Sequence, residues 1–121
     1  MAKKVSASVL DGGLDAIAAC TEMYVCTSEP LDRAAAIAAS LIGAVVLGAV
    51  DFTKAAGIGT NRKITIAQQA DIPITSSGDA THVVLCTGTE MRVVTTCTLQ
   101  TLTSGGTVTV PAFEYEAQQP T

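Results

Sequence analysis

The sequence predicts a mainly β fold, an antiparallel β-sandwich or barrel-like domain with one short N-terminal helix. Runs rich in Val and Thr recur at intervals of about eight to twelve residues, and turn residues such as Gly, Ser and Pro separate them. β-branched side chains suit a pleated strand, and small flexible residues supply the turns. Near the start, Leu10, Leu14 and Ile17 recur at the spacing of one helix face. These observations place a helix ahead of a series of strands.

The length and composition favour a single domain with a thin core. The chain has 121 residues and is 48% hydrophobic, with two tyrosines, two phenylalanines and no tryptophan. A chain of this length forms one domain, which we place at residues 8–117, between an arm at residues 1–7 and a tail at residues 118–121. Because the core must be built from Val, Ile and Leu with small residues between them, we expect partner contacts to add stability.

The predicted helix covers residues 9–19 and follows an arm that we expect to be flexible. Ser8 followed by Asp11 forms a weak capping box at its start. Gly12 and Gly13 each weaken the helix by roughly 1 kcal/mol relative to Ala. We therefore expect the helix to form because its apolar face packs on a sheet.

A half-buried strand is predicted over residues 22–27. Met23 and Val25 alternate with Tyr24 and Cys26, so the two pairs face opposite sides of the strand. The sequence Ser-Glu-Pro that follows is a break or a helix start, since Pro suits the first turn of a helix.

The middle of the chain, residues 34–50, carries no charge over seventeen residues. This length makes it a borderline candidate for a membrane span, but much of it is Ala and Gly, which gain little from lipid. We instead expect a helical turn or an irregular crossing over residues 31–40. A buried strand is then predicted over residues 41–46 and continued by residues 47–52.

A loop and two short strands are predicted next. Residues 53–61 contain two glycines and are expected to form the loop. Residues 62–68 alternate, with Ile64 and Ile66 on one face of a strand. Residues 72–74 must form an edge or a bulge, because their Pro cannot donate a hydrogen bond to a neighbouring strand.

The last third of the chain is predicted to form further strands after a turn at residues 76–79. Residues 82–87 and 91–98 are expected to pair as a hairpin, and strands are expected at residues 107–110 and 113–116. The sequences TGT and TSGG supply the turns between them.

No residue is predicted to be catalytic, to bind a cofactor or to hold a metal. His82 is the only histidine, and no carboxylate lies at a useful spacing, so we expect a structural or exposed histidine. Residues 57–60 are rich in Gly but lack the Lys-Ser ending of a phosphate-binding loop. Two carboxylate pairs share a helix face or a strand face, and such pairs are usually solvated. These pairs are Asp11 with Asp15 and Glu114 with Glu116.

The four cysteines, Cys20, Cys26, Cys86 and Cys97, lack the short paired spacings of a zinc site. If the hairpin turns near TGT, Cys86 lies nearly opposite Met91 or Arg92 and too far from Cys97 for a disulfide. We expect all four to be reduced, small, buried apolar residues. Cross-linking between chains after release from the cell is the alternative.

The net charge is −4 and the isoelectric point is about 4.7. Nucleic-acid binders usually carry a basic stripe, and the nearest approach to one is Lys54, Arg62 and Lys63, which we interpret as a solvated loop. This argues against nucleic-acid binding. The apolar run after the first two lysines is short and broken by serines, so we expect no signal peptide and synthesis in a cytoplasm.

The sequence resembles a family of small structural proteins from the virions of tailed bacteriophages. The resemblance spans nearly the whole chain, and its last segment is the most specific part. It rests on the segments VLDGGLDAI, MYVCTSEP, GAVDFT, RKITIAQQ and ATHVVLCTGTEMRVVTTCTLQTLTSGGTVTVPAFEYEAQQP.

This resemblance implies that the protein is a component of the virion, and it implies no catalytic residues in this sequence. Within a virion, a small acidic β domain is most similar to a capsid decoration, or cement, protein on the outer capsid surface. The expected partners are the major capsid protein and further copies of the chain, most simply as a trimer, with no nucleic acid and no membrane. The protein is expected on the virion after synthesis in the cytoplasm of the bacterial host.

Two alternatives compete with the capsid role. A tail or neck component of the particle is the nearest, and a small cellular enzyme or binding domain is the second. For the capsid role, we expect contact through the arm at residues 1–7 and the loop at residues 53–63, whose Lys54, Arg62 and Lys63 contrast with an acidic domain.

Overall fold

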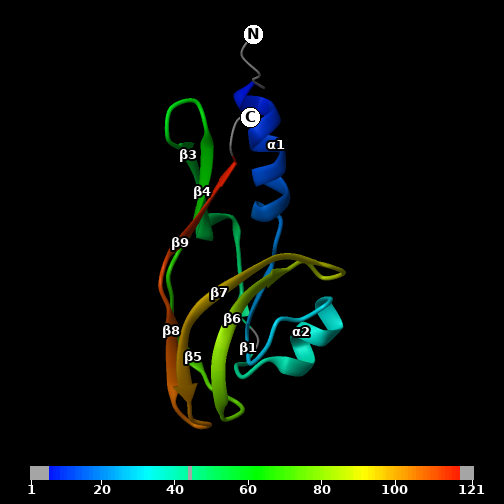
Figure 1. Cartoon of the computed structure of the whole chain (residues 1–121), viewed down its shortest axis with the longest axis vertical. Coiled ribbons are helices and arrows are strands. Elements are labelled where there is room, and N and C mark those ends of the chain that lie inside the picture. Colours follow the sequence, from blue (N-terminus) through cyan, green and yellow to red (C-terminus); the bar gives the residue numbers. More distant parts are fainter. Residues whose placement is uncertain (1–5, 44, 118–121) are drawn as a thin grey trace.

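The computed structural model describes residues 6–43 and 45–117, and its mainly β architecture confirms the predicted fold class. Three antiparallel sheets and two α-helices make up the described part of the chain. Figure 1 shows an elongated molecule in which α1 (Ala7–Ala18) and one sheet form one end, and the other strands form a curved body. The predicted tail, and all but the last two residues of the predicted arm, lie outside the described residues.

Helix α1 forms where it is predicted, and the three residues of its apolar face are buried. Its N-cap is Ser6, whose side chain makes no capping hydrogen bond. The predicted capping box is wrong because Ser8 lies inside the helix. The carboxylate of Asp11 instead accepts a hydrogen bond from Arg62.

The largest sheet has four strands in the order β2-β1-β6-β7. These are β1 (Glu22–Cys26), β2 (Val45–Val46), β6 (Gly78–Cys86) and β7 (Met91–Leu102). Strands β6 and β7 form the predicted hairpin, and Cys86 lies opposite Met91, one of its two predicted partners. The predicted turn at residues 76–79 is shorter than expected because β6 already begins at Gly78.

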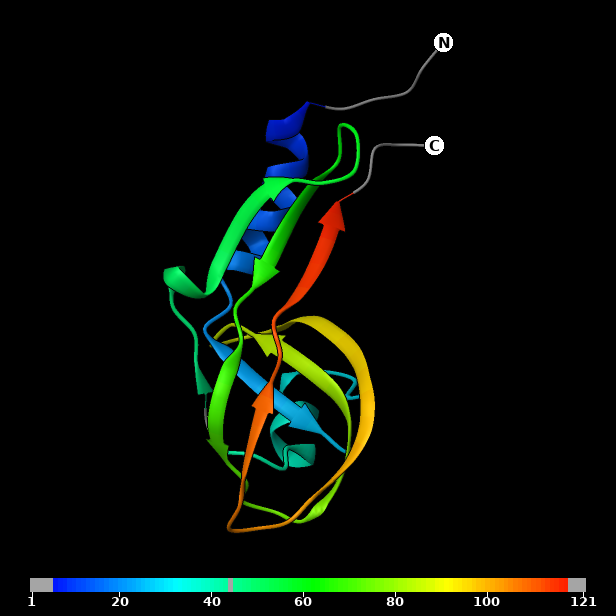
Figure 2. The ribbon, with the colours of Figure 1, turned by 90° about the vertical axis from the view of Figure 1, so that its left-hand side faces the viewer.

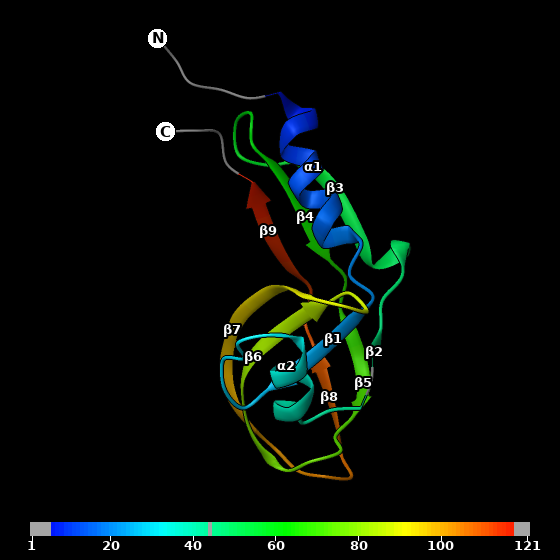
Figure 3. The same cartoon turned by 90° about the vertical axis from the view of Figure 1, so that its right-hand side faces the viewer.

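Helix α2 (Arg33–Ala39) lies across β1 and β6, as Figure 3 shows. Its start is capped by Asp32, whose Oδ1 accepts a 2.8 Å hydrogen bond from the Ala35 amide. The prediction of a half-buried β1 is wrong, because α2 covers its second face. The residues buried between α2 and the sheet are Ala36 of the helix and Tyr24, Cys26, Val84 and Cys86 of the strands.

The second sheet has the order β3-β4-β9 and carries α1 on one side. Its strands are β3 (Phe52–Ala56), β4 (Arg62–Ile66) and β9 (Phe113–Ala117). Ile64 and Ile66 are fully buried, which confirms their predicted shared face. The loop predicted at residues 53–61 is wrong in its first half, because β3 pairs with β4 along its whole length and leaves a turn at residues 57–61.

The third sheet pairs β5 (Gln69–Pro73) with β8 (Thr107–Val110). The register shifts between Gln69 and Ile72, and Asp71 adopts a positive φ of 55°. The predicted edge or bulge around Pro73 is therefore confirmed.

The uncharged middle of the chain contains little strand. After α2, Ile42 makes an isolated bridge to Ile74, β2 has only two residues, and a 3₁₀ turn, η1, follows at Ala49–Asp51. The predicted strand over residues 41–46 and its continuation over residues 47–52 are wrong. One local cause is Asp51, whose Oδ2 accepts a hydrogen bond from the Gly48 amide and closes the turn. Within residues 6–43 and 45–117, no helix is long and apolar enough to cross a membrane.

One apolar core connects the two ends of the molecule. Leu14 of α1 and Ile64 of β4 belong to the same buried cluster as Met23 of β1 and Leu85 of β6. The end formed by α1 and the β3-β4-β9 sheet is therefore packed onto the curved body.

Candidate functional site

The wall of the curved body is open along one line. Around the body, the backbone is connected in the order β7, β6, β1, residues 40–43, β5 and β8. Strands β7 and β8 are joined by a short turn at residues 103–106, yet among the described residues they do not pair with each other. Figure 2 shows β7 bowing away from β8 beyond that turn. We call the space between β7 and the β8–β9 segment the seam.

A β-bulge in β7 accompanies this opening. Ala80 pairs with Gln100 and His82 pairs with Thr96, so three residues of β7 face one residue of β6. Extra residues on one strand bend it and increase its twist. Cys97 is one of the three β7 residues in this bulge and lines the seam.

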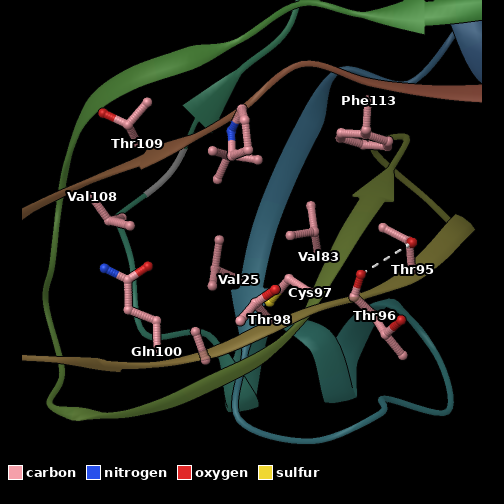
Figure 4. A pocket seen from close by; sticks show the side chains of 13 residues that line it. Val25, Val83, Thr95, Thr96, Cys97, Thr98, Gln100, Val108, Thr109 and Phe113 are labelled. Carbon is pink, nitrogen blue, oxygen red and sulfur yellow. Dashed lines mark hydrogen bonds between the residues drawn. The ribbon is translucent and has the colours of Figure 1, made fainter.

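Two cavities, each of about 390 Å³, follow the seam. The first lies between β7 and β8, with Val25 and Val83 at its floor (Figure 4). The second lies between the start of β7 and β9, beside α1. Thr95 and Phe113 line both cavities, so together the two form one groove along β7.

The wall of the first cavity carries no charged side chain. Burying a charge without a partner is costly, so the cavity suits an uncharged occupant. Its lining is Val25, Ala80, Val83, Thr95, Thr96, Cys97, Thr98, Gln100, Val108, Thr109, Val110, Pro111 and Phe113.

The cysteines differ in their access to this groove. The predicted burial is confirmed for Cys20, Cys26 and Cys86 but is wrong for Cys97, which is partly exposed at the seam, and all four are unpaired thiols. Burial raises the pKa of both Cys26 and Cys86 to about 11, and the Sγ of Cys26 donates to the Ala36 carbonyl. Because these two thiols stay protonated at neutral pH, neither provides a thiolate nucleophile.

The most connected polar group is a network at the start of α2. Arg33 donates to both Glu22 carboxylate oxygens at 2.9 Å and to the Thr87 carbonyl at 3.0 Å. The Tyr24 hydroxyl also donates to Glu22. The hydrogen bond from Arg33 holds the pKa of Glu22 below its usual range. The network attaches α2 to β1 and leaves no free acid or base.

The basic residues predicted to form a solvated loop are instead in strands and in ion pairs. Lys54 pairs with Asp15, Arg62 pairs with Asp11 at 2.9 Å, and Lys63 pairs with Glu114 at 2.6 Å. The first two pairs connect β3 and β4 to α1. The interpretation of Asp11 and Asp15 as a solvated pair therefore holds for Asp15, which is exposed although ion-paired, and is wrong for Asp11, which is partly buried.

The other residues considered from the sequence take part in local hydrogen bonds or turns. Glu116 accepts a 2.8 Å hydrogen bond from Asn61 at the β3–β4 turn. The glycine-rich residues 57–60 form part of that turn, where Gly59 adopts a φ of 62°. His82 is partly buried, and its Nδ1 lies 2.8 Å from the Thr81 hydroxyl. Within the described ranges, no group of three or more His, Cys, Asp or Glu side chains is placed to hold a metal ion.

The seam is the feature that sequence reasoning missed. Residues 93–102 contain no charge, which is a usable signal for an unprotected edge, but only the pairing shows that β7 is an edge strand. Comparison of the chain with protein-family models, with curated proteins and with solved structures found no match.

Proposed function

We propose that this protein is a structural component of a bacteriophage virion that binds the outer capsid surface and stabilises the shell. The proposal combines the sequence resemblance with surfaces that suit contact with other polypeptides. The partners would be the major capsid protein and further copies of the chain, on particles assembled in the bacterial host. Contacts that form only on the assembled shell stabilise it by mass action.

The observation that carries this proposal is a pair of exposed apolar side chains at one end of the molecule. The first turn of α1 and the β3–β4 turn lie at the same end (Figure 2). There Ile58 is 81% exposed and Val9 is 61% exposed. Because Lys54, Arg62 and Lys63 are already in ion pairs, we assign shell contact to these apolar side chains rather than to the basic residues.

The test is binding to assembled particles that lack the protein. Saturable binding at a fixed number of sites per shell, with a higher melting temperature of the shell, would support the capsid role. Absence from shells combined with recovery in isolated tails would move the protein to the tail or neck alternative. Enzymatic turnover by purified protein without particles would favour the cellular alternative.

A matched pair of variants locates the contact surface. Ile58→Asp places a charge on the proposed shell-facing end, and we expect at least a tenfold loss of affinity for particles, because that charge must be desolvated on binding. Val50→Asp adds the same charge at an exposed residue of η1 and should bind like the wild type. Equal binding by both variants would contradict the assignment of this end.

A further inference from the structure

The free edge of β7 is the longest unpaired strand edge in the described structure. Strand β7 has twelve residues, and its only sheet partner within residues 6–43 and 45–117 is β6. Both seam cavities lie along its other edge, with α1, β8 and β9 on their far side, and no described strand pairs with that edge between Arg92 and Gln100. An uncovered edge presents backbone donors and acceptors that can pair with another strand.

The β7 edge also lacks the features that usually protect strand edges. Charged side chains, Pro and short length discourage pairing between molecules. Other sheet edges have one of these features: β2 has two residues, β8 has four, β3 contains Lys54, β9 contains Glu114 and Glu116, and β5 ends at Pro73. Residues 93–102 of β7 have neither charge nor Pro over ten residues. Their one protection is the bulge, which limits regular pairing to a short stretch around residues 93–96.

We propose that two copies of this chain associate through their β7 edges, which pair antiparallel across a two-fold axis. The pairing joins the two four-stranded sheets into one continuous sheet, and the β7 strand of each copy occupies the seam of the other. This self-association surface goes beyond the proposed shell binding and does not depend on it.

A second copy fits this edge for three reasons. Two identical strands related by a two-fold axis run antiparallel and present the same surface to each other, so the contact closes without further growth. The chain carries a net charge of −4, so copies repel except where the surface is uncharged, as it is along residues 93–102. Leu99, which is 61% exposed on β7, provides apolar surface beside the pairing stretch.

The experiment measures the mass of the purified full-length chain in solution over a range of concentrations, by sedimentation or light scattering, without particles. We expect twice the mass of the 12.3 kDa chain. Thr96→Lys places a charge at an exposed position on the β7 edge and should raise the dimer dissociation constant at least tenfold. Thr53→Lys, at an exposed position on edge strand β3, is the matched control and should remain dimeric. Thr98→Lys replaces the first variant if that variant does not fold.

Cys97 supplies a second readout. It is the partly exposed cysteine, whereas the other three are buried, so a small alkylating reagent reports on the seam. Alkylation of Cys97 should slow as the protein is concentrated into dimers, and this protection should disappear in Thr96→Lys.

The proposal fails if the wild type is a monomer at all concentrations or forms the trimer expected from the sequence. It also fails if Thr96→Lys leaves the dimer intact. A monomer whose Cys97 becomes protected only on particles would assign the seam to a strand of a different protein, and would overturn pairing between copies. Shell binding is measured separately, so failure of one proposal does not decide the other.

Discussion

Cys26 and Cys86 act as small apolar residues that fill the core, and their thiols are not placed to react. Both thiols lie beneath α2, where Tyr24 and Val84 complete an apolar cluster. Small thiols fill this space without the polar atoms that Ser would bring. Their raised pKa values follow from the same burial, because ionisation would place a charge in a site without a buried cation.

This burial predicts a loss of stability at high pH. In the folded state the pKa of each thiol is about 11, against an ordinary value near 9. A raised pKa means that the folded state binds the proton more tightly, so this contribution is fully present below pH 9 and is lost as the pH rises from 9 to 11. Each thiol should contribute roughly 1–2 kcal/mol to the loss. Urea unfolding under reducing conditions at pH 8 and pH 10.5 measures it.

A double variant isolates the two thiols from other groups that titrate in the same range. Cys26→Ala combined with Cys86→Ala should be less stable at pH 8, because of the cavities it creates, but should lose clearly less stability at pH 10.5. Cys97→Ala is the control and should keep most of the wild-type loss. An identical loss in the double variant would show that the buried thiols do not cause it.

At the scale of the elements, sequence periodicity predicted the parts that have one clearly buried face. Leu10, Leu14 and Ile17 identify α1, and Ile64 with Ile66 identifies β4. Strand β3 was missed because its sequence FTKAA does not alternate. It is a strand because β4 pairs with it, and pairing partners are not visible in local sequence.

The candidate site was harder to predict than the fold. The run of Val and Thr in β7 predicts a strand correctly, but nothing in it marks the bulge at residues 97–99, which contains neither Gly nor Pro. Whether a strand lies at an edge is a property of the sheet order, and sequence patterns do not reveal that order. The same applies to Lys54, Arg62 and Lys63, whose acidic partners become visible only once α1 is packed on β3 and β4.

Replacing either of two glycines with Ala should change the stability of the protein, but in opposite directions. Gly12 lies within α1, and an added methyl group would meet no atom within 4 Å, so Gly12→Ala should stabilise the protein by about 1 kcal/mol. Gly59 lies in the β3–β4 turn with a φ of 62°, so Gly59→Ala should destabilise the protein by about 1 kcal/mol. Chemical unfolding of both variants measures the two effects. A gain in stability for Gly59→Ala would contradict the assigned turn geometry.

At the scale of the whole molecule, the elongated shape raises the question of whether its two ends fold independently. Figure 1 separates α1 and the β3-β4-β9 sheet from the curved body. The buried core does not separate them, since Leu14 and Ile64 belong to the same cluster as Met23 and Leu85. A small domain has little buried surface to divide between two independent units. We therefore expect one cooperative unit.

A core substitution at one end should accordingly weaken the other. Leu14 is fully buried in α1, and Leu14→Ala should lower the free energy of unfolding by about 2–5 kcal/mol. If the molecule unfolds as one unit, hydrogen exchange of the amides in β1 and β6, within the body, should accelerate by the same free energy. Val9→Ala, at an exposed position on the same helix, should change exchange little. Unchanged exchange in β6, despite the destabilised α1 of Leu14→Ala, would show instead that the α1 end unfolds alone, because the shared core would then not couple the two ends.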